Sequence, residues 1–225
     1  AVRSGASPGR AAALSGPGHP PLDQRVQRGA EAGWRFVVRH WLALLNVVVV
    51  LFAGLPVLAP LLVATGHADL ALAIYAAYQI VCHQMPSRSF FLLGHEPVSA
   101  GDEIVHLGGA TARDFIGSPE IGFKVAYCER DLAIYTTVAI AGLLFALVRR
   151  RLPPPSLRVY ALSVVPMALD GLTQLVGLRE STWELRVLTG SLFGATSAWL
   201  VYAHLERAMA RARARLEGSR DRDAS

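Results

Sequence analysis

Long apolar stretches separated by short charged segments constrain this chain more than any other feature. Hydrophobic residues make up 52% of the 225 positions and charged residues only 17%, against roughly 25% charged residues in an ordinary soluble domain. A bilayer core about 30 Å thick needs about 20 apolar residues in a helix. We therefore predict an all-α fold, a polytopic membrane helix bundle of about five transmembrane helices. The predicted spans are residues 41–65, 69–83, 132–148, 159–178 and 185–204.

The remaining segments suggest a simple organisation around this bundle, which covers residues 41–205. Residues 1–24 are rich in Ala, Gly, Ser and Pro and are expected to be disordered. Residues 25–40 are expected to form a basic interfacial segment, and residues 206–225 an Arg-rich polar tail. The 44-residue loop 87–130 is too long for a plain connector, which favours a lid or a binding loop.

The charges of the connecting segments predict an orientation. Segment 149–158 carries four Arg and no acid, whereas loop 87–130 has four basic and six acidic residues. By the positive-inside rule, segment 149–158 and the C-terminal tail are cytoplasmic and loop 87–130 is external. Five spans then place the basic N-terminal segment outside, against the rule. A re-entrant first segment at Pro56 and Pro60 would remove the conflict, as would a long loop that faces the cytoplasm.

The net charge of +5 does not indicate a nucleic-acid partner. All but one of the 22 basic residues are Arg, and most of them flank apolar spans or lie in the tails. This distribution is typical of anchoring to anionic membrane lipid. We expect membrane lipid as a partner, no nucleic acid, and a location in the cell inner membrane.

The first group of candidate site residues closes the second predicted span. Cys82, His83 and Gln84 precede Pro86, which disfavours helix at the residue before it, so Cys82 and His83 lie near the last helical turn. Either residue also has an ordinary interpretation, because interfacial His and buried Cys are common.

The second group opens the third predicted span. Cys128 and Asp131 are three residues apart and share a helix face, and both are metal-ligand types. An Asp at the positive end of a helix dipole needs no further reason, but Cys128 does. If the second to fifth spans all cross, both groups lie at the same membrane face.

The third group surrounds an acid inside the fourth predicted span. Asp170 lies about 12 Å below the end of that span, at a depth where a charge needs a partner, water or a proton. Gln174 and Arg179 continue a polar path above it. The spacing of Ser181 and Glu184 predicts a capping box for the fifth span. Asp170 is expected to pair with a cationic side chain of the same half of the bundle: Arg88, Arg130, Arg179, Arg186 or His83.

Gly190 and Gly194 have GxxxG spacing in the fifth predicted span. Such a face allows close approach of another helix, either within the chain or in a homodimer.

The motifs CHQMPSRSFF, YCERDLAIY and MALDGLTQLVGLRESTWELRVLTGSLFG resemble those of a family of predicted membrane proteins, domain of unknown function 2085, over residues 68–205. The resemblance implies a membrane fold with a shared polar site, and it implies no reaction. Where relatives have a second Cys after the Cys-x-Arg motif, this chain has Asp131, which weakens a thiol-only site. The matching positions are Cys82, His83, Gln84, Arg88, Cys128, Arg130, Asp131, Asp170, Gly171, Gln174, Arg179, Glu180 and Arg186.

Three functions are compatible with these patterns. The first is a divalent metal site, with zinc the best-suited ion, formed by Cys82, His83, Cys128 and Asp131. The second is thiol–disulfide exchange between the two cysteines, with a membrane quinone as a candidate electron acceptor. The third is a small proton-coupled transporter that uses Asp170. A single pocket with Asp170 as its floor and the metal ligands as its rim would unite these residues. The candidate catalytic residues are Asp170, Arg179 and Glu180, and the candidate cofactor-binding residues are Gln84, Arg88, Arg130 and Gln174.

Overall fold

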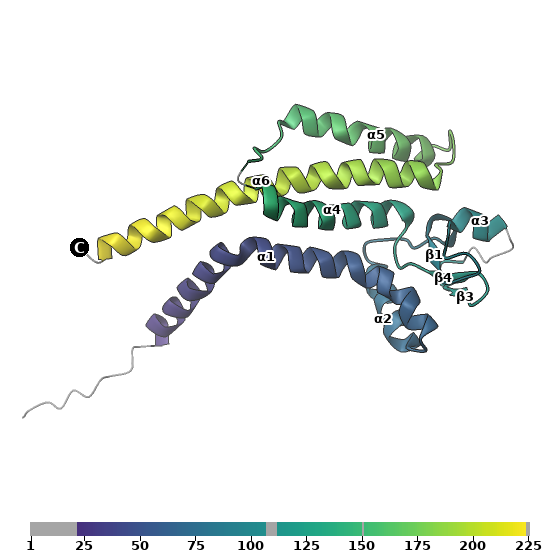
Figure 1. Cartoon of the computed structure of the whole chain (residues 1–225), viewed down its shortest axis with the longest axis horizontal. Helices are drawn as coiled ribbons and strands as arrows, with labels where there is room; N and C mark the ends of the chain where they lie inside the picture. The colour runs from purple at the N-terminus through teal and green to yellow at the C-terminus, as the bar shows by residue number, and fades with distance from the viewer. Residues whose placement is uncertain (1–21, 107–111, 150, 224–225) are drawn as a thin grey trace, which may run out of the picture.

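A computed structural model describes residues 22–106, 112–149 and 151–223. The predicted disordered segment 1–24 falls almost entirely outside these residues. The described part of the chain contains six α-helices, one 3-10 turn (Pro86–Arg88) and four short strands. The prediction of a mainly helical fold is confirmed, although the chain is not purely α-helical. Figure 1 shows the long helices stacked side by side, with the small sheet at one end of the stack.

Helix α4 (Glu129–Val148) and helix α6 (Trp183–Asp223) form the centre of this stack. A Cβ atom on Gly190 would lie 2.9 Å from the Arg130 carbonyl oxygen, and one on Gly194 would lie 2.6 Å from that of Ile134. Only glycine permits such close approach of the two backbones. The GxxxG face is therefore packed against α4 within the chain, and the homodimer stays a prediction.

Helix α1 (Leu22–Ala64) packs on the other side of α4, and helix α5 (Leu157–Leu175) packs on α6. The predicted interfacial segment 25–40 is a continuous part of α1, and residues 206–223 of the predicted tail continue α6. At the end of the bundle near Trp41, Asn46 on α1 donates to the Gly142 carbonyl (3.1 Å) and accepts from the Tyr202 hydroxyl (2.9 Å). These bonds join α1, α4 and α6.

Two prolines inside α1 provide attachment points for the rest of the chain. Because Pro56 and Pro60 lack an N–H, the carbonyls of Phe52 and Pro56 have no helical partner. The hydroxyls of Tyr78 and Tyr127 donate to the Phe52 oxygen at 2.9 and 3.2 Å. The backbone N–H of Ala126 donates to the Pro56 oxygen at 3.1 Å. The prolines thus fix the segment before α4 against α1.

Helix α2 (Ala68–Tyr78) contradicts the predicted second span at 69–83. Its 11 residues extend about 16 Å, roughly half of a bilayer core. After Tyr78 the chain continues as a turn over residues 79–81 and as irregular backbone up to Pro86. Among the described residues, α1 and α4 are the two helices whose length and hydropathy alone suffice for a membrane span. Five crossings are therefore not confirmed.

The predicted loop 87–130 is partly folded. Strands β1 (Phe91–Leu92), β2 (Val98–Ser99), β3 (Gly117–Ser118) and β4 (Gly122–Lys124) form an antiparallel sheet in the order β2-β1-β4-β3. In the central pair, Phe91 is opposite Lys124. Helix α3 (Gly101–His106) lies beside the sheet (Figure 1). This small subdomain covers the end of the bundle where α4 and α6 begin and α5 ends.

Candidate functional site

Cys82 lies where the chain turns away from α2. Its backbone N–H bonds to the Tyr78 carbonyl at 3.0 Å, which closes the end of the helix. The Arg113 guanidinium donates to the carbonyls of Gln79 (3.1 Å) and Cys82 (3.4 Å), because carbonyls at a helix C-terminus attract a cation. The Cys82 side chain is buried beside Tyr78 and Tyr127.

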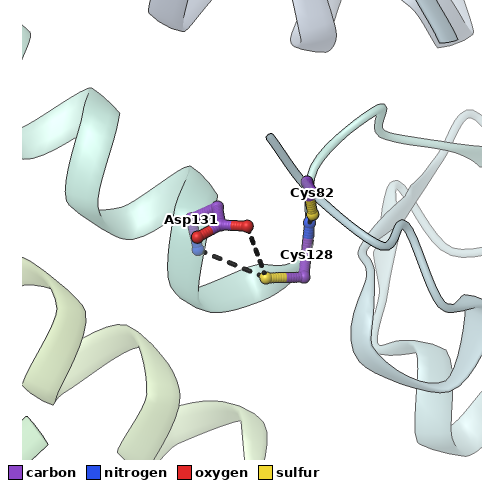
Figure 2. Close-up of side chains that lie close together, drawn as sticks. All are labelled: Cys82, Cys128 and Asp131. Atoms are coloured by element: carbon purple, nitrogen blue, oxygen red, sulfur yellow. Dashed lines mark hydrogen bonds between the residues drawn. The ribbon is translucent and has the colours of Figure 1, made fainter. Parts of the chain in front are cut away.

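Cys128 is the N-cap residue of α4, with extended backbone angles. Its Sγ accepts from the Asp131 N–H at 3.4 Å and its thiol donates to Asp131 Oδ2 at 3.1 Å. Its own N–H donates to Cys82 Sγ at 3.1 Å. Figure 2 shows Asp131 on the first turn of α4, and Cys82 reaching the same point from the neighbouring segment. The helix start therefore brings together residues 46 positions apart in the sequence.

The ligand atoms of Cys82, Cys128 and Asp131 all lie within 4.8 Å of one another. No ion pair to Asp131 occurs in the described ranges of the chain. The adjacent Cys128 thiol lowers the pKa of Cys82. The same contact, together with burial and the charge of Asp131, raises the pKa of Cys128. Of the two thiols, Cys82 therefore loses its proton more readily than Cys128.

The neighbours of Cys82 in the predicted motif have different environments. His83 is exposed and lies outside the group of three converging ligand atoms. Gln84 is buried, with a φ of 52°. Its side-chain amide donates to the Tyr75 carbonyl at 2.8 Å, and its N–H approaches Cys82 Sγ at 3.5 Å. Gln84 thus holds the turn that positions Cys82.

Asp170 forms a second cluster, and the expectation that it pairs with a cation is confirmed. Its carboxylate bonds to Arg130 (2.5 Å) and Arg179 (2.6 Å), and the Ser181 hydroxyl donates to it at 2.9 Å. Only 2% of its side chain is exposed. The predicted capping box is wrong for Ser181, because this hydroxyl serves Asp170 rather than the backbone of α6.

The remaining predicted polar residues lie on the surface above Asp170. Arg88 and Glu180 form an exposed ion pair at 3.6 Å, and the Gln174 amide donates to Glu180 at 3.3 Å. No hydrogen bond between the described residues joins this surface group or Asp170 to the two cysteines. The hydrogen bonds therefore form two adjacent clusters, and the single pocket that would unite them stays a prediction.

The first turn of α4 connects the two clusters. Consecutive residues on a helix point about 100° apart, and three charged residues here reach three different partners. Arg130 bonds to Asp170 and Asp131 faces Cys128, while Glu129 forms a buried ion pair with Arg186 at 2.7 Å. Arg186 was a candidate partner of Asp170, and it binds Glu129 instead.

Lys124 is a buried residue of this region that the motifs did not single out. Its Nζ donates to the carbonyls of Gln84 (2.9 Å) and Arg113 (2.7 Å). The backbone carbonyl of Lys124 accepts a hydrogen bond from the Tyr75 hydroxyl. Burial lowers the pKa of Lys124 to about 8. It is the single Lys among 22 basic residues, a compositional signal that could have drawn attention to it. Lys124 thus connects strand β4 to helix α2, through Tyr75, and to the turn after Cys82, through Gln84.

Comparison with known proteins gives the family. Residues 120–200 match the family model described as "Predicted membrane protein (DUF2085)". An uncharacterised protein of Methanocaldococcus jannaschii is 32% identical over 134 residues, which are 59% of this chain and 68% of the relative. No solved structure matches. The matched regions include Cys128, Asp131 and Asp170, and the chain belongs to the predicted membrane protein family of domain of unknown function 2085.

Proposed function

We propose that this protein is an integral membrane metalloprotein that binds a divalent metal ion, preferably Zn²⁺, through Cys82, Cys128 and Asp131. The observation that carries the proposal is the convergence of three ligand atoms within 4.8 Å from two separate segments. Each segment is held by contacts of its own, namely the Arg113 bonds at the end of α2 and the N-cap of α4. The site is therefore preorganised.

The geometry suits zinc without a large rearrangement. Tetrahedral Zn²⁺ with Zn–S distances of about 2.3 Å requires sulfur atoms roughly 3.8 Å apart. A separation at the 4.8 Å limit needs to close by about 1 Å, and the 3.1 Å contact between Cys128 Sγ and Asp131 Oδ2 needs to open by roughly 0.4 Å. Two thiolates and a carboxylate would also place up to three negative charges together, and the described residues supply no ion pair to Asp131. A divalent cation would balance most of that charge, because coordinating thiols are deprotonated by the metal.

Three protein ligands leave one coordination position for water or a substrate, as in catalytic rather than structural zinc sites. The bound ion would supply Lewis acidity and lower the pKa of a water ligand. His83 follows Cys82 directly and is exposed, so it is the candidate for a fourth ligand if its backbone turns. With His83 bound, the site would be closed and structural.

We also propose that four helices cross the membrane: the apolar parts of α1 and α6, and all of α4 and α5. Helices α4 and α5 have 20 and 19 residues, close to the thickness of a bilayer core. Four crossings put segment 25–40, segment 149–158 and the C-terminal extension of α6 on one face. These are the three most basic parts of the chain, and the positive-inside rule makes this face cytoplasmic. The sheet and the cysteines then face outward across the inner membrane.

Elemental analysis of the full-length protein, purified in mild detergent, tests the metal site. We expect about one zinc per chain, lost in Cys82→Ser, Cys128→Ser and Asp131→Asn. Asp69→Asn is the matched control, since this acid lies in the first turn of α2, away from the three ligands. His83→Ala retains zinc if three residues suffice. Wild-type protein that is purified without bound metal, and whose circular dichroism spectrum is that of a folded helical protein, would overturn the proposal.

Reporter fusions test the crossings separately. Four crossings predict that fusions at the start of α1, in segment 151–156 and after α6 all report cytoplasm. A fusion between α1 and α2 should report the outer face. Opposite locations for the two chain ends would restore an odd number of crossings.

A thiol–disulfide function is a second candidate, favoured by the 3.1 Å bond from the Cys128 N–H to Cys82 Sγ, which stabilises a Cys82 thiolate. Both cysteines are free in the structure. Joining them would release two protons and two electrons, with a membrane quinone as the proposed acceptor. Alkylation and mass spectrometry of intact membranes separate the candidates. Reversible loss of both thiols with oxidant supports exchange, and thiols protected only while metal is bound support the metal site.

A further inference from the structure

A long apolar groove lies between α1 and α4, away from both polar clusters. Its larger cavity, of about 660 Å³, is lined by apolar side chains from Leu42 to Leu51 of α1 and by Leu143 and Ala146 of α4. A second cavity of about 440 Å³ continues it toward Leu61. Val50 and Leu143 line both cavities. The groove therefore runs along the helices from one end of the bundle toward the other.

The groove has one basic end. Arg39, His40 and Arg149 line the larger cavity beside its apolar residues. Arg149 lies 3.6 Å from Glu206, whereas Arg39 forms no ion pair within the described ranges. Arg39 and His40 are exposed. Positive charge thus meets apolar surface at this end of the groove.

The length of the larger cavity matches one leaflet of a bilayer. Residues 39–51 of α1 cover about 18 Å along the helix, slightly more than half of a hydrocarbon core about 30 Å thick. With the four crossings proposed above, on which this step rests, its apolar walls lie at the depth of acyl chains, and its basic end lies at the depth of headgroups on the face that carries the Arg-rich segments.

We propose that this groove is a binding site for an anionic phospholipid of the basic, cytoplasmic leaflet. The acyl chains lie between α1 and α4, and the headgroup phosphate bonds to Arg39 and Arg149. Guanidinium groups bind phosphate through paired N–H donors. Charge complementarity selects the lipid class, because a zwitterionic headgroup brings no net charge to the two Arg. The proposal is independent of the metal site.

Native mass spectrometry of the full-length protein tests this site, with phosphatidylglycerol or phosphatidylcholine of the same chains added to the detergent. We expect phosphatidylglycerol to be retained roughly 25-fold more strongly, since each of the two Arg near the membrane surface contributes about a fivefold preference for anionic lipid. Arg39→Gln with Arg149→Gln removes the preference. Arg25→Gln with Arg158→Gln is the control, with the same loss of charge at exposed positions outside the groove.

A steric variant keeps the test valid if the double Arg variant does not fold. Ala146→Phe fills the larger cavity and should cause loss of phosphatidylglycerol retention, whereas Leu144→Phe, on an exposed position outside the lining, should not. Equal retention of the two lipids would overturn the proposal, as would an unchanged preference in both groove variants. Displacement of the lipid by excess glycerol phosphate would indicate a free-phosphate site, and a dimer that excludes lipid would indicate a second copy in the groove.

Discussion

Two polar clusters lie at the same end of the bundle and differ in how the protein balances their charge. Around Asp170, two Arg and one Ser hydroxyl bond to the carboxylate, so the chain itself neutralises the buried acid. Around Asp131, the neighbours are two sulfur atoms, and the described residues form no ion pair with its carboxylate. A closed cluster of the first kind stabilises a fold, whereas a cluster of electron-rich atoms is suited to bind an ion or to change redox state.

The largest expected effect separates the clusters by replacing each acid. Asp170→Asn leaves Arg130 and Arg179 without their carboxylate, and breaking a buried ion pair costs about 3–5 kcal/mol. We expect a large fall in thermal stability in detergent, with an unchanged zinc content per folded molecule. Asp131→Asn should show the reverse, with loss of zinc and little change in the stability of metal-free protein. Loss of zinc in folded Asp170→Asn would show that the clusters act as one site.

The buried Lys124 sharpens the comparison through pH. Its pKa of about 8 lies below the ordinary value of 10.5, so between these values the unfolded chain binds more protons than the folded one. Stability therefore rises as the pH increases from about 8 to 10.5, by on the order of 3 kcal/mol. Thermal unfolding across this range should show the rise in wild type and a smaller one in Lys124→Met. Identical pH profiles of wild type and Lys124→Met would mean that folding does not lower the pKa of Lys124.

The tyrosines that hold the cysteine cluster against α1 should have a smaller effect. Tyr78 and Tyr127 both donate to the Phe52 carbonyl that Pro56 leaves free. Replacing either by Phe leaves the other donor, at a cost of about 0.5–1.5 kcal/mol. The double variant leaves a buried carbonyl unsatisfied and should cost more than the sum of the two. A double-mutant cycle measures this excess, and additive effects would mean that the two hydroxyls do not share one acceptor.

The surface pair gives the smallest effect. Arg88 and Glu180 are exposed and 3.6 Å apart, and such pairs contribute about 0–1 kcal/mol. Arg88→Gln and Glu180→Gln should leave both stability and zinc content nearly unchanged. A strong effect of either substitution on transport or catalysis, once a substrate is known, would give these residues a functional role that their contacts do not indicate.

The sequence was most informative where chemistry is local. Three-residue spacing put Cys128 and Asp131 on one helix face, and the cost of burying a charge required a cation for Asp170. Glycine spacing likewise indicated the close contact now seen between α4 and α6. Each inference used a rule that operates within a few turns of helix or at one buried atom.

The sequence was less informative where distant segments compete for a partner. Apolar composition made 69–83 resemble a span, but the helix ends at Tyr78, where Arg113 from the sheet subdomain binds the nearby Gln79 carbonyl. The choice between Arg130 and Arg186 for Asp170 depends on which way each residue points in the folded bundle. The strands of the subdomain are only two or three residues long, too short to give a periodic signal.

X-ray absorption at the zinc edge of the purified protein tests the central claim most directly. We predict a first shell with two sulfur atoms at about 2.3 Å and lighter oxygen or nitrogen ligands at about 2.0–2.2 Å. Purified Cys128→Ser protein should lack zinc, and any zinc that it takes up from excess ion should have one sulfur ligand fewer. Zinc bound only by oxygen and nitrogen, with both thiols still open to alkylation, would contradict the assignment of Cys82, Cys128 and Asp131 as the metal site.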